Sequence, residues 1–211
     1  MIVILCSKLV GDANSNTIAA AASVELLHNA TLIHDDVVDD SKTRRNKPTI
    51  NSIWDNHIAV LVGDYFVSCA MQQAISTGDI RIIDSLCHLG KLLSLGEIDQ
   101  IYNARYHTLT EETYYNIIGN KTASLFVACA KMGCYAAGVA DERVDALAEF
   151  ARLLGLCFQI RDDVFDYFGS DSIGKPTSND LKEGKITLPL LHTLLREDLP
   201  DHSAMLELSR K

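Results

Sequence analysis

The chain has 211 residues, of which 47% are hydrophobic and only 7% aromatic, so it is long enough to bury a mainly aliphatic core. The four prolines and the abundance of Ala and Leu predict an all-α fold, taken as a single domain over 1–211. The net charge of −9 argues against nucleic acid as a partner.

The six cysteines stand singly in apolar segments, without a Cys-x-x-Cys pair, which excludes an ordinary zinc site. We expect them to be small core residues in a reducing compartment, and hence a cytoplasmic protein, peripheral to a membrane at most. They are Cys6, Cys69, Cys87, Cys129, Cys134 and Cys157. No membrane span or signal peptide is expected, because the apolar start over 1–6 is too short for either.

The first predicted helix covers 2–10, and a second, over 17–40, ends in an acidic cluster. Asp35 and Asp39 lie one helical turn apart in this cluster and therefore share a face, with Asp36 and Asp40 beside them. Like charges at this spacing repel one another, and a hard divalent cation with oxygen ligands would relieve the repulsion. The alternative interpretation is a solvated acidic patch at the end of a helix.

A basic loop follows the acidic cluster directly and holds Lys42, Arg44, Arg45 and Lys47. Charge neutralisation of the aspartates would explain these cations. Because guanidinium groups suit bidentate contacts to phosphate, we favour a phosphate-binding role.

Further helices are predicted over 58–76 and 80–103, with a shorter piece over 50–57. Asp64 falls inside an apolar helix, so we expect it to be buried with a cationic partner from another segment. Thr110 can cap the next helix. Lys121 and Thr122 precede the apolar run 123–134; a lone lysine there is more often a surface residue.

Asp141 is expected to cap the last long helix, over 142–168, which carries a second acidic cluster with Asp162, Asp163 and Asp166. Two clusters with the same spacing, both flanked by apolar sequence, favour two facing acidic helices that hold Mg²⁺ and a diphosphate. Lys175 and Lys185, in the polar loop over 169–185, suit a flap over an anionic ligand. Helices over 186–196 and 203–210 complete the chain.

These motifs, in this order, resemble those of the trans-isoprenyl diphosphate synthases, the polyprenyl synthetase family. Besides the two acidic clusters, the resemblance covers Arg44-Arg45, the stretch 62–65, Gly96-Glu97 with Gln100, Lys121-Thr122, and the Gly-Lys-Pro and Glu-Gly-Lys segments over 174–185. It implies an all-α bundle around a deep central cavity, usually as a homodimer.

The resemblance also implies roles for individual residues. Asp35 and Asp39 would ligate two Mg²⁺ ions and Asp162 a third, with Asp36, Asp163 and Asp166 in the same metal-binding set. Catalytic roles would fall to Asp35, Asp39, Asp162, Lys121 and Lys175. The substrate diphosphates would be bound by Arg44, Arg45, Lys121, Thr122, Gln159, Lys175 and Lys185.

The implied reaction condenses isopentenyl diphosphate with an allylic diphosphate through an allylic carbocation, to give an all-trans polyprenyl diphosphate. Ala30 and Thr31, about one turn before Asp35, would line the upper tunnel for the growing chain, and both are small. We therefore expect a product longer than farnesyl, which would bring the protein transiently to a membrane.

Two alternatives remain: a non-catalytic or regulatory subunit of a heteromeric synthase, and a terpene cyclase. Retention of both acidic clusters argues against the first, and the absence of a second metal motif rich in Asn, Ser and Glu argues against the second. The family also carries a Gly-Lys-x-x-Arg-Pro segment ahead of this chain's start and further helices beyond its end. We therefore expect a partial domain with weak activity, in which Asn46 replaces a usual glycine and alters the basic loop.

Overall fold

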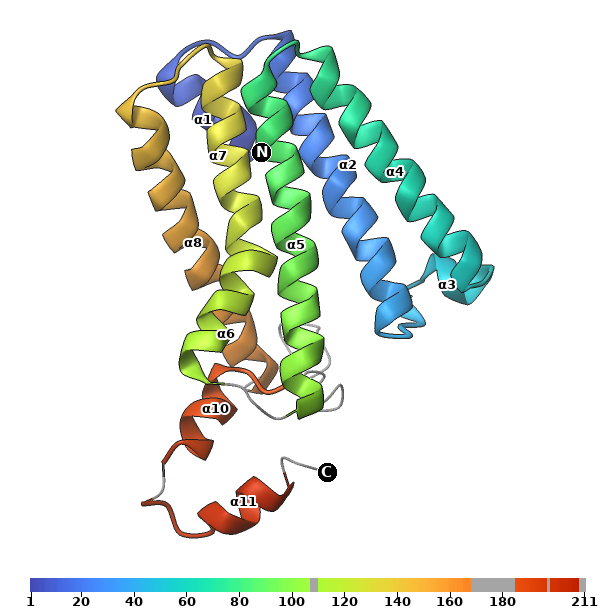
Figure 1. The fold of residues 1–211 in the computed structure, drawn as a ribbon, viewed down its shortest axis with the longest axis vertical. Coiled ribbons are helices and arrows are strands. Elements are labelled where there is room, and N and C mark those ends of the chain that lie inside the picture. Colours follow the sequence, from blue (N-terminus) through green and yellow to red (C-terminus); the bar gives the residue numbers. More distant parts are fainter. Residues whose placement is uncertain (107–109, 168–184, 197, 209–211) are drawn as a thin grey trace.

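The computed structural model describes residues 1–106, 110–167, 185–196 and 198–208. Long helices lie roughly alongside one another and form an all-α bundle (Figure 1), which confirms the predicted fold class. The long helices of the bundle are α2 (Ser15–Val38), α4 (Asn56–Ser76), α5 (Ile80–Tyr106), α7 (Ser124–Ala136) and α8 (Glu142–Tyr167), with the shorter α1 (Ile2–Val10) packed on α7.

Side-chain caps fix where several of these helices begin. Asn14 and Thr17 form a reciprocal capping box at the start of α2. Thr110 and Thr113 form the same motif at the start of α6 (Glu111–Ile118), as the sequence predicted for Thr110. The carboxylate of Asp141 accepts a hydrogen bond from the backbone N–H of Arg143 at the start of α8, at 3.1 Å.

The largest core cluster lies between α2, α5 and α7. It contains Val24 and Leu27 from α2, Leu86 and Leu89 from α5, and Met132 from α7. Burial of these aliphatic side chains stabilises the three helices against one another, by roughly 1.5–3 kcal/mol for each fully buried side chain. This packing holds α2 and α5 on two sides of the site described below.

The basic loop forms a small antiparallel hairpin rather than irregular structure. Strand β1 (Thr43–Arg44) pairs with β2 (Lys47–Pro48), and the short helix α3 (Ile50–Ile53) follows. Arg45 and Asn46 form the two-residue turn, with φ values of 51° and 60°. Asparagine tolerates this left-handed conformation, so Asn46 is compatible with a position where the sequence resemblance led us to expect glycine.

The C-terminal part contains α10 (Leu188–Leu194) and α11 (His202–Leu208), near the two helices that the sequence predicted there. Both lie at the end of the bundle to which α5 and α8 run (Figure 1). Residues 169–184 of the predicted flap, with Lys175, lie outside the described residues, whereas its last residue, Lys185, is described.

Two expectations about burial were wrong. Cys87 and Cys157 are exposed, whereas Cys6, Cys129 and Cys134 are buried. Asp64 is not a buried residue, since 63% of its side chain is exposed, and its partner is the imidazole of His34 at 3.3 Å. In each case the apolar segment forms a helix with one side facing solvent. The hydrophobic content of the segment alone does not tell which residues lie on that side.

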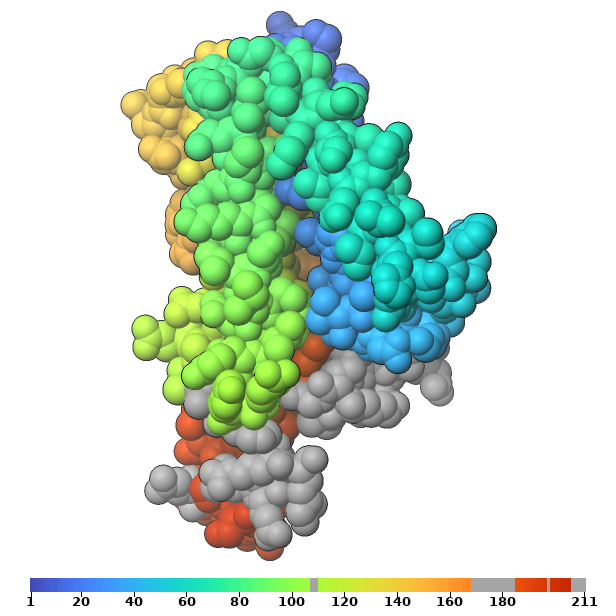
Figure 2. All heavy atoms as spheres, turned by 45° about the vertical axis from the view of Figure 1, so that its right-hand side comes forward, coloured from blue at the N-terminus to red at the C-terminus, as the bar shows by residue number. Residues whose placement is uncertain are grey.

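Helix α4 lies on the outer surface of the bundle (Figure 2), and it carries exposed apolar side chains along its length. They include Leu61, Tyr65, Met71 and Ile75. By length and composition alone α4 is able to cross a membrane, which the sequence analysis did not expect. A helix whose apolar side is buried against a protein partner has the same composition. The exposed apolar surface of α4 therefore indicates a contact with either a membrane or a second protein chain.

Candidate active site

A cavity of about 620 Å³ lies between α2, α5, α7 and α8. Asp35 and Thr31 line it from α2, and Gln159 lines it from α8. Much of the remaining wall is apolar, formed by Leu32, Leu93, Ile98, Ile101, Leu125, Phe126 and Phe158. Ala30, the other predicted tunnel residue, is fully buried and does not belong to this lining.

A smaller and more polar cavity of about 180 Å³ adjoins the first. The two cavities share Lys121, Thr122 and Gln159, and the smaller one adds Asp163 and Lys185. The helices that bear the two acidic clusters therefore border one joined space, α2 through Asp35 and α8 through Gln159 and Asp163.

Lys121 and Thr122 lie on a single π-helical turn, η1 (Gly119–Ala123), between α6 and α7. A π turn inside an α-helix changes the direction of its side chains and is frequent at functional sites. Glycines on both sides allow neighbouring helices to approach it. A Cβ on Gly96 of α5 would lie 2.8 Å from the backbone nitrogen of Lys121, and one on Gly155 of α8 would lie 2.6 Å from Cα of Ala123.

Two side chains of helix α5 bind the Lys121 ammonium. The Lys121 Nζ forms a short ion pair with the carboxylate of Glu97 and donates to Gln100 Oε1 at 3.2 Å. Both partners of the ion pair are largely buried. A cation fixed by two neighbours loses little conformational entropy when it meets an anion in the cavity.

The carboxyl group of Asp35 lacks sufficient positive charge around it. Burial raises its pKa to about 6, the carboxylates of Glu97 and Asp39 add to the rise, and the Lys121 ammonium opposes it. An additional cation beside Asp35 would therefore stabilise the ionised form.

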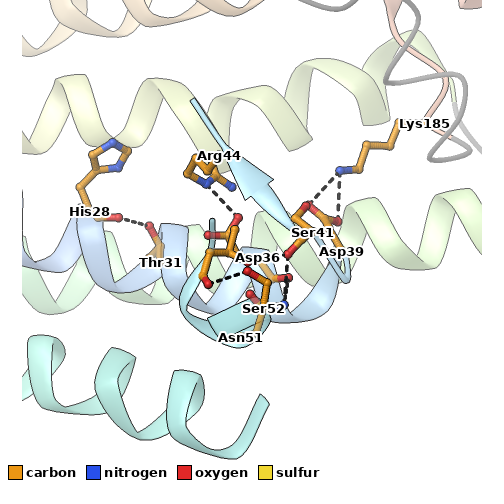
Figure 3. A network of polar contacts seen from close by, with 10 residues as sticks. His28, Thr31, Asp36, Asp39, Ser41, Arg44, Asn51, Ser52 and Lys185 are labelled. Atoms are coloured by element: carbon orange, nitrogen blue, oxygen red, sulfur yellow. Dashed lines mark hydrogen bonds and ion pairs between the residues drawn. The ribbon is translucent and has the colours of Figure 1, made fainter. Parts of the chain in front are cut away.

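The neighbouring Asp36 points to different partners (Figure 3). Its Oδ1 accepts a hydrogen bond from Arg44 Nε at 2.9 Å, and its backbone carbonyl accepts from Asn51 Nδ2 at 3.1 Å. Asp36 is only 7% exposed and ties the hairpin to the end of α2. One residue step on a helix turns the side chain by about 100°, so Asp35 and Asp36 face different neighbours.

Asp39, at the end of α2, is bound by a cation from the C-terminal part (Figure 3). The Lys185 Nζ lies 3.2 Å from Asp39 Oδ1 and 3.4 Å from Oδ2. The structure thus brings together two predicted site residues that are 146 positions apart in the chain.

In the second cluster, Asp163 is almost completely buried, with 4% exposure, while Asp162 and Asp166 are half-buried. Tyr114 Oη donates to Asp163 Oδ2 at 2.6 Å, and Gln159 Nε2 donates to Oδ1 at 2.7 Å. Burial raises the pKa of Asp163, and these two hydrogen bonds oppose the rise.

Comparison with known proteins identifies the family. The family model described as Polyprenyl synthetase matches residues 1–211. The chain is 38% identical to octaprenyl diphosphate synthase of Escherichia coli, over 98% of this chain and 64% of that protein. It thus spans less than two thirds of that relative's length.

The chain belongs to the polyprenyl synthetase family. Solved structures agree with this assignment. A decaprenyl diphosphate synthase from Rhodobacter capsulatus superposes with a TM-score of 0.86 at 36% identity, over 99% of this chain and 70% of that one. A polyprenyl synthase from Caulobacter crescentus, complexed with calcium and isoprenyl diphosphate, gives a TM-score of 0.89 at 33% identity, over 99% of this chain and 68% of that one.

The donor set fits the Mg²⁺ implied by the polyprenyl synthetase family. Asp35, Asp39, Asp162 and Asp166 offer carboxylate oxygens, which Mg²⁺ prefers, and Asp35 needs a cation. Within the described ranges, no three acidic, His or Cys side chains form a ready-made metal site.

Arg45, the remaining predicted phosphate ligand, lies exposed at the tip of the hairpin and lines neither cavity. Tyr114 was not among the predicted site residues. A signal for it existed, since it precedes Lys121 by seven residues, about two helical turns, on a helix whose capping threonine was recognised.

Proposed function

We propose that this protein is a prenyltransferase that joins isopentenyl diphosphate head-to-tail to an allylic diphosphate, giving an all-trans polyprenyl diphosphate and inorganic diphosphate. The observation that carries the proposal is the joined cavity, in which Asp35 and Lys121 meet a largely apolar wall. Charged groups at one end and apolar side chains along the rest suit a diphosphate with a hydrocarbon tail.

Magnesium held by Asp35 and Asp39 on one side and by Asp162 on the other would stabilise the departing diphosphate as its charge develops. Asp36, Asp163 and Asp166 would support these ligands, with Asp36 oriented by Arg44 and Asp163 oriented by Tyr114 and Gln159. The expected number of ions is three for each site.

The chain's own residues supply the remaining chemistry. The Lys121 ammonium, and Lys185 once it leaves Asp39, bind diphosphate oxygens at the polar end. The allylic C–O bond breaks, the isopentenyl double bond forms the new C–C bond, and the proton lost from the adduct passes to the released diphosphate. Apolar side chains such as Phe126 and Phe158 keep water away from the allylic cation.

The product is proposed to be longer than farnesyl. Thr31 is a small residue in the cavity wall on the same helix as Asp35, and Ala30 adds no bulk beside it. A tail that enters at Asp35 therefore meets little steric hindrance along the turn of α2 that precedes Asp35.

We further propose that two copies of the chain associate through α4. The exposed apolar row of α4, with Leu61, Tyr65 and Ile75, supports this arrangement, because a second copy would bury it. Six free cysteines accord with the proposed cytoplasmic location.

The direct test is to incubate the 211-residue chain with isopentenyl diphosphate, farnesyl diphosphate and Mg²⁺, and to measure product masses. Slow elongation by five-carbon units is expected, because the chain spans only 64% of the Escherichia coli relative, and Asp35→Asn should reduce the rate further by ~10²–10³-fold. Binding of magnesium and diphosphate without any elongation would favour the regulatory-subunit alternative.

A further inference from the structure

Tyr114 joins α6 to the second acidic cluster through one buried hydrogen bond. Its side chain is 3% exposed and packs with Ile118 and Leu191 in a small apolar cluster. Its hydroxyl donates to Asp163 Oδ2 at 2.6 Å, and both residues also line the smaller cavity. A hydrogen bond from a fixed donor to a buried carboxylate strongly restricts where that carboxylate lies.

The bond from Tyr114 is the end of a longer relay. Gln159 Nε2 donates to the other oxygen of Asp163 at 2.7 Å, and Thr122 Oγ1 donates to Gln159 Oε1 at 2.7 Å. An ionised carboxylate only accepts hydrogen bonds, so the amide N–H of Gln159 must face Asp163 and its carbonyl must face Thr122. The direction of every hydrogen bond in the relay is therefore fixed by Asp163.

The relay residues line the cavities of the site, and the direction of their hydrogen bonds decides which of their groups can meet a ligand. Thr122 has a single hydroxyl proton and donates it to Gln159, so it offers no donor to a diphosphate while the relay is intact. Asp163 accepts one hydrogen bond on each oxygen, from Tyr114 and from Gln159, and these two bonds fix its orientation. Through Thr122, the relay links the π turn η1, which carries Lys121, to helix α8, which carries Asp162 and Asp166.

We propose that Tyr114 is a positioning residue of the diphosphate site. Through Asp163, it holds the ligand-facing carboxylates of α8 in register with the Lys121 ammonium on η1. This inference rests on the proposed function, because it concerns the same site. It adds that a neutral phenol in the wall of the smaller cavity sets, through its hydrogen bond to Asp163, the spacing between the metal-binding helix and the cation.

The test is Tyr114→Phe, which keeps the ring and removes the donor. Tyr115→Phe is the matched control, because Tyr115 is the next residue, is 39% exposed and lines neither cavity of the site. Calorimetry would measure the affinity for inorganic diphosphate in the presence of Mg²⁺. We expect Tyr114→Phe to weaken it about tenfold and Tyr115→Phe to leave it within about twofold.

A double-mutant cycle then separates positioning from simple loss of stability. If Tyr114 acts through Asp163, Tyr114→Phe has little further effect on diphosphate affinity in an Asp163→Ala background. Equal and additive effects in both backgrounds would overturn the proposal. If Tyr114→Phe does not fold, Thr122→Val and Thr122→Ser test the other end of the relay, and Val must weaken affinity more than Ser.

The outcomes distinguish this proposal from the function on which it rests. A wild-type chain that binds no diphosphate with Mg²⁺ argues against the proposed function. A wild-type chain that binds it, together with an equally tight Tyr114→Phe variant, argues against the role of Tyr114 alone.

Discussion

The π turn that carries Lys121 fits against α5 only because residue 96 has no side chain. In Gly96→Ala the new Cβ would lie 2.8 Å from the backbone nitrogen of Lys121 and 3.1 Å from the Cβ atoms of Asn120 and Lys121. Ordinary contact begins at 3.4 Å, so α5 and η1 must separate by about half an ångström. The obstacle is backbone, which cannot rotate away as a flexible side chain would.

The cost of this separation can be measured against a control on the same helix. A Cβ on Gly90 of α5 meets only Leu27 Cδ2, at 4.0 Å. Both substitutions gain the helix propensity of alanine over glycine, ~1 kcal/mol, so this gain cancels in the comparison. Overpacking typically costs ~1–3 kcal/mol, and we expect Gly96→Ala to be less stable than Gly90→Ala by that amount.

Urea unfolding followed by circular dichroism would give the free energy of unfolding for both variants. Calorimetry with diphosphate and Mg²⁺ should in addition show a loss of about tenfold or more for Gly96→Ala alone, since displacement of a charged group weakens its contacts sharply. Equal free energies of unfolding for the two variants would refute the packing argument. Equal diphosphate affinities would refute the link between this packing and Lys121.

Four further predictions follow from single contacts. Lys185→Gln should strengthen Mn²⁺ binding in the absence of diphosphate and weaken it in its presence, because Lys185 occupies Asp39; calorimetry in both conditions checks this. Asp36→Asn should accelerate hydrogen exchange in residues 43–48 several-fold and cost ~1–2 kcal/mol, because it weakens the bond from Arg44; unchanged exchange would contradict the anchoring role. Thr31→Phe should shorten the product in mass spectra, since its side chain enters the cavity wall, and an unaltered product distribution would count against that path. Hydrogen bonds from Arg81 lower the pKa of Asp79 in the folded state. The ionised Asp79 therefore stabilises the fold fully above about pH 4, and this stabilisation is lost as the pH falls further. The difference in Tm between the wild type and Asp79→Asn should shrink over the same pH range.

Local chemistry in the sequence determined most of the helices and the spacing of the reactive groups. Capping residues such as Thr110 and Asp141 place helix starts without reference to the rest of the chain, because their hydrogen bonds reach only two or three residues onward. The same holds for Asp35 and Asp39, whose shared face follows from helix geometry alone. The family resemblance rests on such local patterns, read in order.

Tertiary structure alone decided what each side chain meets. Helix geometry turns Asp35 and Asp36 in different directions, but only the packing of the chain decides that Asp35 lines the cavity and that Asp36 binds Arg44 of the hairpin. Tyr114 becomes part of the site because α6 packs against α8 at Asp163, a contact between residues 49 positions apart. Partners at such distances depend on how whole helices pack, and no local pattern specifies that arrangement.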